Sequence, residues 1–214
     1  MIELCGVTKE FHGNTVVEDV SLKFEEGMIY GITGRNGSGK TILLKMIMGL
    51  VRPTKGEVFI DGKPLRAGFF AEDTGVVCDS IGFLPQLSAM ENLYSLARIQ
   101  KKIGIPEIQR ILERMGLDAD SKKVYRKFSL GMKQKLAIAQ AFMEQPRILL
   151  LDEPMNGLDE ESVEDMREFF KEYVKKHNAV MVLTSHNRED IGELCSCTYR
   201  IGKGGRLCLE SPEN

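Results

Sequence analysis

The chain of 214 residues has no tryptophan, only seven prolines and no excess of one charge, since 29 Lys and Arg residues face 31 Asp and Glu residues. The resulting net charge of −2 gives no electrostatic basis for nucleic acid as the main partner, because domains that bind nucleic acid usually carry a basic excess. Hydrophobic residues make up 43% and charged residues 28%, which excludes a disordered or collagen-like chain. We expect one soluble domain that buries its own core.

Cysteine pairs and long apolar runs are also missing. The five cysteines form no CxxC pair, so a structural zinc site has little support. Cys195-x-Cys197 leaves a metal or redox pair open, but small buried residues in a reducing cytosol are the simpler interpretation. The most apolar windows, 41–50 and 148–151, are far shorter than the roughly 18 residues of a membrane span. Residues 1–3 do not begin a signal peptide, so we expect no such leader and a cytoplasmic location.

Hydrophobic patterning predicts strands that alternate with helices. Apolar or alternating runs bounded by turns predict strands at 2–7, 16–24, 28–33, 57–60, 75–78, 147–151, 179–184, 199–201 and 206–209. Helical spacing predicts helices at 41–50, 131–143, 160–176 and 188–195. Between 85 and 128 strand formers thin out, and Pro106 and Gly116 mark the start and end of one helix. The fold class is therefore α/β, with a mostly parallel sheet covered on both faces and a helical insertion.

A phosphate-binding loop follows the strand at 28–33 and opens the helix at 41–50. Its pattern is G-x-x-x-x-G-K-[ST], formed by Gly34, Arg35, Asn36, Gly37, Ser38, Gly39, Lys40 and Thr41. Glycines bring backbone N–H groups onto the phosphates, and the helix N-terminus adds partial positive charge. We expect Lys40 to reach the β- and γ-phosphates and Thr41 to ligate Mg²⁺. A glycine-rich turn that binds nothing is the alternative, although the pattern arises by chance in only about one chain in a hundred.

The loop alone does not identify the nucleotide. No Asn-Lys-x-Asp guanine-reading motif is present, which argues against a GTPase. Phe11, just past the first predicted strand, offers a π face that suits a purine, so it is a candidate for stacking on adenine. Packing of Phe11 in the core remains the alternative.

Two acids and a histidine follow the later strands. Asp152 and Glu153 end the apolar run 148–151, which delivers them to the carboxyl edge of a parallel sheet, where the phosphate loop also lies. Asp152 is placed to hold Mg²⁺, and Glu153 to polarise the attacking water. His186 follows the strand at 179–184 and is a candidate to face the γ-phosphate. An exposed acidic turn, and a histidine at the surface or at a helix cap, are the simpler structural alternatives.

A second helix N-terminus suited to an anion lies before the helix at 131–143. Ser129 is a good N-cap, and Gly131 lets a phosphate approach the backbone. Taken alone, this segment would be an ordinary capped helix.

With these motifs in this order, the sequence resembles the ATP-binding subunits of ABC transporters over essentially its whole length. Asn156-Gly157-Leu158-Asp159 is similar to the family's D-loop, and His186 to its switch histidine. The resemblance implies a P-loop NTPase core with an N-terminal antiparallel β subdomain, in a single domain over 1–214. Residues 1–84 and 131–214 would form the core with the β subdomain, and 85–130 the helical subdomain.

The resemblance also implies ATP, Mg²⁺ and partners. Two cassettes, as a homodimer or a heterodimer with a related chain, would enclose each ATP between Lys40 and Thr41 of one and Ser129 and Gly131 of the other. Asp159 would lie at that interface. A separate integral-membrane permease would hold the cassette on the inner face of the membrane, with much of the docking groove at 85–128.

Two departures from the family pattern stand out. In the Leu-Ser-Gly-Gly-Gln signature, Leu130 replaces the first glycine and Met132 the glutamine, so we expect a weaker closed dimer. Gln86 looks like the Q-loop residue but lies only five residues before Glu91, whereas Asp79 lies twelve before it and matches the usual spacing better. Asp79 is therefore a candidate ligand of Mg²⁺ or its water, with Gln86 as the alternative.

The signature, the acid in the Q-loop and the Thr184–Asp190 segment are similar to the subgroup that exports bacitracin and lantibiotics. This resemblance implies an ATPase that drives export of an antibiotic or antimicrobial peptide. An import cassette is the alternative, since importers and exporters of the family use the same kind of ATPase cassette. A non-transport ATPase acting on DNA or ribosomes is disfavoured, because the chain has neither paired cassettes nor a long coiled-coil insertion.

Overall fold

Two β-sheets form the framework of the protein. The structure, a computed structural model, describes residues 1–66, 70–78 and 82–210. One sheet is antiparallel with strand order β2-β1-β4-β5. Its strands are β1 (Ile2–Phe11), β2 (Asn14–Phe24), β4 (Lys55–Ile60) and β5 (Lys63–Pro64).

The other sheet has the order β10-β9-β3-β8-β7-β6 and is parallel except for the edge pair β9 and β10. Its strands are β3 (Ile29–Thr33), β6 (Thr74–Val77), β7 (Ile148–Asp152), β8 (Val180–Thr184), β9 (Cys197–Ile201) and β10 (Leu207–Glu210). The described residues thus confirm the predicted combination of an antiparallel sheet near the N-terminus with a mostly parallel core sheet.

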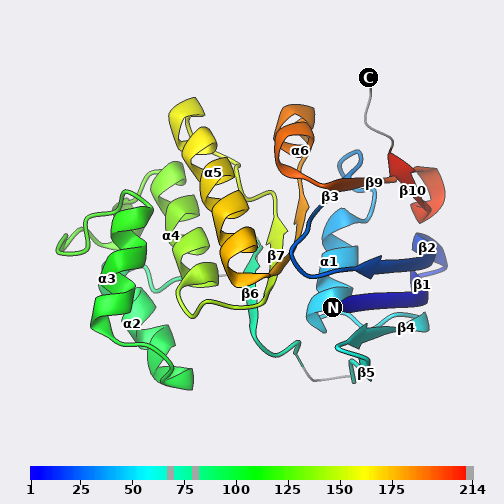
Figure 1. The fold of residues 1–214 in the computed structure, drawn as a ribbon, viewed down its shortest axis with the longest axis horizontal. Helices are drawn as coiled ribbons and strands as arrows, with labels where there is room; N and C mark the ends of the chain where they lie inside the picture. Colours follow the sequence, from blue (N-terminus) through cyan, green and yellow to red (C-terminus); the bar gives the residue numbers. More distant parts are fainter. Residues whose placement is uncertain (67–69, 79–81, 211–214) are drawn as a thin grey trace.

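Helices surround the parallel sheet and extend to one end of the molecule. They are α1 (Lys40–Met48), α2 (Ala89–Gln100), α3 (Ile105–Arg114), α4 (Leu130–Phe142), α5 (Glu160–His177) and α6 (Arg188–Leu194), with short 3-10 turns η1 (Tyr125–Lys127) and η2 (Lys203–Gly205). Figure 1 shows α2 and α3 at one end and the antiparallel sheet at the other. No helix among the described residues combines the length and apolar character needed to cross a bilayer.

The central strands bury both of their faces, because successive side chains of a strand point in opposite directions. Leu150 and Val182 pack with α1 and the antiparallel sheet, whereas Leu149 and Leu151 pack with residues of α4 and α5. All four are fully buried. Helices α1 and α4 therefore cover opposite faces of one sheet, and each such leucine or valine contributes about 1.5–3 kcal/mol to folding.

The parallel pairing brings three strand ends to the same edge. Residue Asp152 of β7 is the register partner of Thr184 of β8, which is in turn the partner of Ile32 of β3. The loops after β3, β7 and β8 consequently start side by side, and α1 begins beside them. This edge is where an open α/β sheet binds its ligands.

Most predicted elements are present, with shifted ends. The first strand runs to Phe11 instead of Val7, because antiparallel pairing with β2 resumes after irregularities in the register. Strand β5 was not predicted: it has two residues and one of them, Pro64, is a poor strand former. Helix α3 begins at Ile105, so Pro106 occupies its first turn as expected.

The cysteines differ from the uniformly buried residues that we expected. Cys5 and Cys208 are exposed, Cys78 is buried, and Cys195 and Cys197 are half-buried. Cys5 faces away from the core because it alternates along β1 with the buried Leu4, whereas Cys208 lies on the edge strand β10, where its neighbour Leu209 is exposed as well. Burial raises the pKa of the Cys195 thiol to about 12.

These thiols should differ in reactivity. We expect Cys208 to react with a small alkylating reagent at pH 8, whereas Cys195 stays protonated and unmodified because the thiolate is the nucleophile. Peptide mass spectrometry after a short labelling pulse measures both residues in the same sample. Equal labelling of Cys195 and Cys208 in the folded protein would contradict the raised pKa of the Cys195 thiol.

Candidate functional site

The loop between β3 and α1 is shaped by glycines at positions that exclude a side chain. Gly39, the N-cap of α1, has φ of 105°, and a Cβ there would lie 2.7 Å from the carbonyl oxygen of Val16. Gly34 has φ of 150°, and a Cβ there would lie 2.6 Å from Ser38 Oγ. The backbone of the loop can therefore curl around the start of α1 only with glycine at both positions.

The same loop contains polar groups that suit an anionic ligand. Among the described residues Ser38 Oγ has no hydrogen-bond partner although it is buried, and a phosphate oxygen would supply one. The Lys40 side chain is 7% exposed, and its ammonium donates to the carbonyl of Gly34 at 2.9 Å. Together with the N–H groups at the start of α1, these groups fit a polyphosphate.

Asp152 is bound by hydroxyls from two different elements. Thr41 Oγ1, in the first turn of α1, donates to Asp152 Oδ2 at 2.7 Å. Thr184 Oγ1, at the end of β8, donates to Asp152 Oδ1 at 2.6 Å. A carboxylate and a hydroxyl in contact are the hard oxygen donors that Mg²⁺ prefers, so Asp152 and Thr41 fit the metal that accompanies a nucleotide.

Glu153 lies between a lysine and a histidine. Its Oε1 is 3.8 Å from the Lys40 ammonium, and its Oε2 is 2.8 Å from His186 Nδ1. The His186 backbone N–H also donates to Oε2, at 3.2 Å. Glu153 has a positive φ of 48°, the left-handed conformation in which a non-glycine residue is strained, and such strain clusters at functional sites.

A buried ion pair holds the loop that contains His186. Arg167 of α5 donates to Asp190 of α6 at 2.7 Å, and both side chains are buried. Asp190 also accepts from the Ser185 hydroxyl at 3.3 Å, and Ser185 accepts from the Asn187 N–H at 3.0 Å. The residues on either side of His186 are thus fixed to α5 and α6.

The N-terminus of α4 belongs to a separate group of contacts. Ser129 caps the helix by accepting from the Met132 N–H at 3.2 Å, as predicted. Gly131 lies against the loop that follows β7, since a Cβ there would be 3.1 Å from the carbonyl oxygen of Gly157. Leu130 is 67% exposed and covers Gly157, where any Cβ would collide with its side chain.

The loop after β7 connects the two groups. The Gln134 amide on α4 donates to the Pro154 carbonyl at 2.8 Å and to the Glu153 carbonyl at 3.4 Å. At the other end of this loop, Asp159 caps α5 by accepting from the Ser162 N–H at 2.9 Å. That hydrogen bond lowers the pKa of the Asp159 carboxyl, which is exposed.

The structure thus brings Thr41, Asp152, Glu153 and His186 into one hydrogen-bonded group, which Lys40 joins through its ion pair with Glu153. Ser129 and Gly131 lie with the Asp159 loop instead. Two contributing residues were missed from the sequence, Thr184 and Gln134. Thr184 could have been found, because it ends a buried strand two positions before His186. Nothing in the sequence indicates the role of Gln134.

Phe11, Asp79 and Gln86, the remaining predicted site residues, lie outside this group or outside the described residues. Phe11 is 39% exposed, so the alternative that it packs in the core is wrong. The Lys9 ammonium lies 4.8 Å from the centroid of its ring and covers one face of it in a cation–π contact. Asp79 lies outside the described residues, and Gln86 is exposed in the turn before α2.

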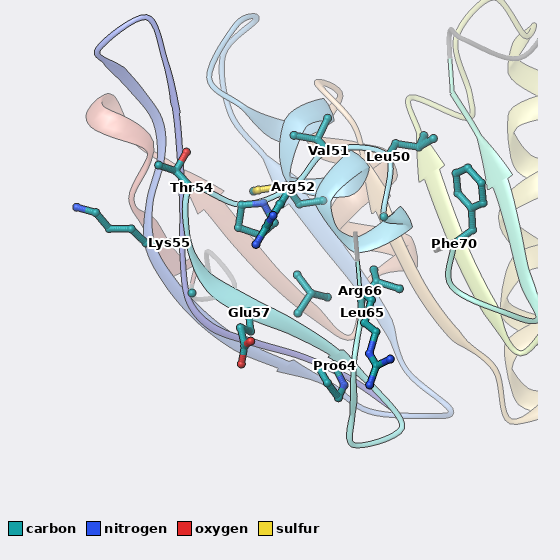
Figure 2. Close-up of a pocket in the computed structure, with 15 residues that line it drawn as sticks. Leu50, Val51, Arg52, Thr54, Lys55, Glu57, Pro64, Leu65, Arg66 and Phe70 are labelled. Carbon is teal, nitrogen blue, oxygen red and sulfur yellow. The ribbon is translucent and has the colours of Figure 1, made fainter. Parts of the chain in front are cut away.

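A cavity of about 850 Å³ lies at the opposite end of α1 from the phosphate loop. Figure 2 shows Leu50, Val51 and Phe70 on one side of it, and Pro64 and Glu57 of the antiparallel sheet on the other. The exposed side chains of Leu50 and Phe70 make this wall apolar. This cavity does not include the hydrogen-bonded group around Asp152.

Comparison with known proteins places the site in a family. Residues 17–156 match the model of the family described as ABC transporter. The chain is 41% identical over 205 residues to the uncharacterized ABC transporter ATP-binding protein YybJ of Bacillus subtilis, covering 95% of this chain and 94% of that protein. It is 37% identical to the bacitracin transport ATP-binding protein BcrA of Bacillus licheniformis, covering 99% of this chain and 70% of that one.

Solved structures that resemble this chain belong to the same family. The dimeric structure of MJ0796, a bacterial ABC transporter cassette, superposes with a TM-score of 0.88 at 26% identity over the whole of both chains. A post-hydrolysis dimer of the same cassette with ADP and Pi superposes with a TM-score of 0.86 at 25% identity, again over both chains. The chain belongs to the ABC transporter family and is one of its ATP-binding, ATP-hydrolysing cassettes.

Proposed function

We propose that this cassette uses the group around Asp152 to hydrolyse ATP and that the hydrolysis powers export of an antibiotic or antimicrobial peptide through a separate permease. The observation that carries the catalytic part is the continuous contact from Thr41 through Asp152 and Thr184 to Glu153 and His186. This contact connects Thr41 and Asp152, whose oxygens are suited to bind a metal ion, with Glu153, whose carboxylate is suited to accept a proton.

In this proposal Lys40 binds the β- and γ-phosphates, exchanging its bond to the Gly34 carbonyl for charged phosphate oxygens. Thr41 and Asp152 would hold Mg²⁺, which neutralises charge on the phosphates. Glu153 accepts the proton of the attacking water. Because His186 contributes both its ring and its backbone N–H to Oε2, the oxygen that faces Lys40, Oε1, is the one available to the water.

We also propose the partners. Ser129 and Gly131 would complete the nucleotide site of a second cassette, which is supported by the dimeric form of the similar MJ0796 cassette. The ATP-dependent dimer would be a homodimer or a heterodimer, attached to the inner face of the membrane by the permease. The domain boundaries expected from the sequence, with a helical subdomain at 85–130, are part of the same proposal, as are the adenine contact of Phe11 and the interface position of Asp159.

Export of a peptide antibiotic is supported by the relatives named for bacitracin transport, at 35% and 37% identity. Import is the second candidate, since the chain is also 29% identical to the arabinose import protein AraG of Vibrio parahaemolyticus, although it covers only 40% of that protein. Transport into inside-out vesicles that contain the cassette and its co-purified permease separates the two. ATP-dependent uptake of bacitracin supports export, and ATP-dependent release of a preloaded solute supports import.

Replacing Lys40 tests the phosphate loop. We expect Lys40→Ala to weaken ATP binding by about 10- to 100-fold, because hydrogen bonds to charged groups contribute roughly 1.5–3 kcal/mol. Lys45→Ala, five positions along the same helix, is the matched control and should bind ATP like the wild type. Calorimetric titration measures both, and near-wild-type affinity in Lys40→Ala would disprove the assignment.

Replacing Glu153 tests the general base. Glu153→Gln keeps the shape of the side chain but cannot accept a proton, so we expect turnover to fall about 10²–10⁴-fold while Mg-ATP still binds. Asp152→Asn should differ by weakening the Mg²⁺ dependence and nucleotide binding together. Steady-state turnover and nucleotide titration of both variants provide the comparison. A wild-type rate in Glu153→Gln would assign the base to another group.

The quaternary state should depend on nucleotide. We expect a monomer without ATP and a weak dimer with it, because each chain contributes half of each site and Leu130 and Met132 depart from the family signature. Glu153→Gln should lengthen the life of the dimer, since it retains ATP and removes a negative charge near the triphosphate. Light scattering with and without ATP measures this, and a tight dimer in the absence of nucleotide would refute the model.

A further inference from the structure

Thr184 connects the two acids of the site through one hydroxyl. Its side chain is 0% exposed, and it lies at the last position of β8, opposite Asp152 in the register. The hydroxyl donates to Asp152 Oδ1 at 2.6 Å and accepts from the Glu153 backbone N–H at 2.9 Å. No other hydroxyl among the described residues has hydrogen bonds to both of these acidic residues.

The direction of each bond follows from the groups involved. A carboxylate only accepts and a backbone N–H only donates, so the single proton of Thr184 must go to Asp152 while its lone pair receives the Glu153 N–H. Neither partner can rotate away without leaving a buried polar group unpaired. The branched Cβ of threonine restricts χ1 further, which keeps the oxygen between its two partners.

The two bonds have separate consequences. The bond to Oδ1, with the bond from Thr41 to Oδ2, fixes the plane of the Asp152 carboxylate. The bond from the Glu153 N–H holds a residue whose φ of 48° is strained for a glutamate. In that conformation the Glu153 carboxylate reaches Lys40 and His186.

We propose that Thr184 is a positioning residue that sets the metal-binding carboxylate of Asp152 and the general base Glu153 relative to one another. The inference rests on the proposed roles of those two acids. Thr184 acts through its neighbours and contacts no reacting atom in this scheme.

Isosteric replacement tests the hydroxyl. Thr184→Val keeps the branched shape and removes both hydrogen bonds, whereas Thr184→Ser keeps the hydroxyl. Thr74→Val is the matched control, because Thr74 starts strand β6 of the same sheet and its hydroxyl donates to the Glu72 carbonyl, away from the site. Three quantities are measured: turnover as a function of Mg²⁺ concentration, ATP binding in the presence of a chelator, and the difference in melting temperature between protein with ATP and Mg²⁺ and protein with ATP alone.

In Thr184→Val we expect turnover to fall about 10- to 100-fold, the range found when a residue supporting a metal ligand is removed. The Mg²⁺ needed for half-maximal turnover should rise, and the Mg²⁺-dependent increase in melting temperature should shrink. Binding of ATP without metal should stay close to that of the wild type, because the Lys40 loop is unchanged. Thr184→Ser should restore most of the turnover, and Thr74→Val should behave like the wild type.

Three results would overturn the inference: wild-type turnover and Mg²⁺ dependence in Thr184→Val, turnover in Thr184→Ser as low as in Thr184→Val, or an equal loss of metal-free ATP binding. If Thr184→Val does not fold, Thr184→Cys replaces it, because a thiol is only a weak donor and acceptor, and an unchanged Mg²⁺ dependence there overturns the inference as well.

Glu153→Gln and Asp152→Asn in the same assays distinguish a failure of this inference from a failure of the proposed function on which it rests. Normal turnover in Glu153→Gln removes the proposed general base. A slow Glu153→Gln beside a normal Thr184→Val removes only the role of Thr184.

Discussion

The two hydroxyl bonds to the Asp152 carboxylate are the interaction on which the site depends. One comes from α1 and the other from β8, while Asp152 itself ends β7. The carboxylate therefore ties the phosphate-loop helix to the two central strands. Because a buried carboxylate is costly without hydrogen bonds, its position requires all three elements to meet at the same point. The parallel pairing of β7 and β8 provides that meeting point.

The sheet also explains why the functional residues fall into two groups. Strands β7 and β8 are buried on both faces, with α1 on one and α4 and α5 on the other. The N-terminus of α1 presents Lys40 and Thr41 on its face, and the N-terminus of α4 presents Ser129 on the opposite one. Two helix N-termini on opposite faces are suited to phosphates of two different nucleotides, as the proposed dimer requires.

Much of this could be predicted from the sequence, where the signal is local. The phosphate loop, the acids after the apolar run and the cap at Ser129 each follow from a few consecutive residues. The parts that failed depend on strand pairing: residues 9–11 extend β1 because they pair with β2 across the turn at His12 and Gly13, and Cys208 is exposed because β10 is an edge strand of its sheet. Likewise the hydroxyl of Thr184 becomes significant only when β8 lies beside β7, a contact between residues 32 positions apart.

The loop from Glu153 to Asp159 links the start of α4 to the backbone of the proposed base. It starts at the proposed base, ends at the cap of α5, and is held between them by the Gln134 amide on the Pro154 carbonyl and by Leu130 on Gly157. Gly157 has φ of 77°, and a Cβ there would lie 2.5 Å from Leu130, so this contact allows no side chain. The start of α4 consequently cannot shift far without moving the backbone that carries Glu153. In the proposed dimer, Ser129 at the start of α4 would contact the nucleotide of the partner cassette. Engagement of one nucleotide site would then reposition the base of the other, which makes the two sites interdependent without any contact between their nucleotides.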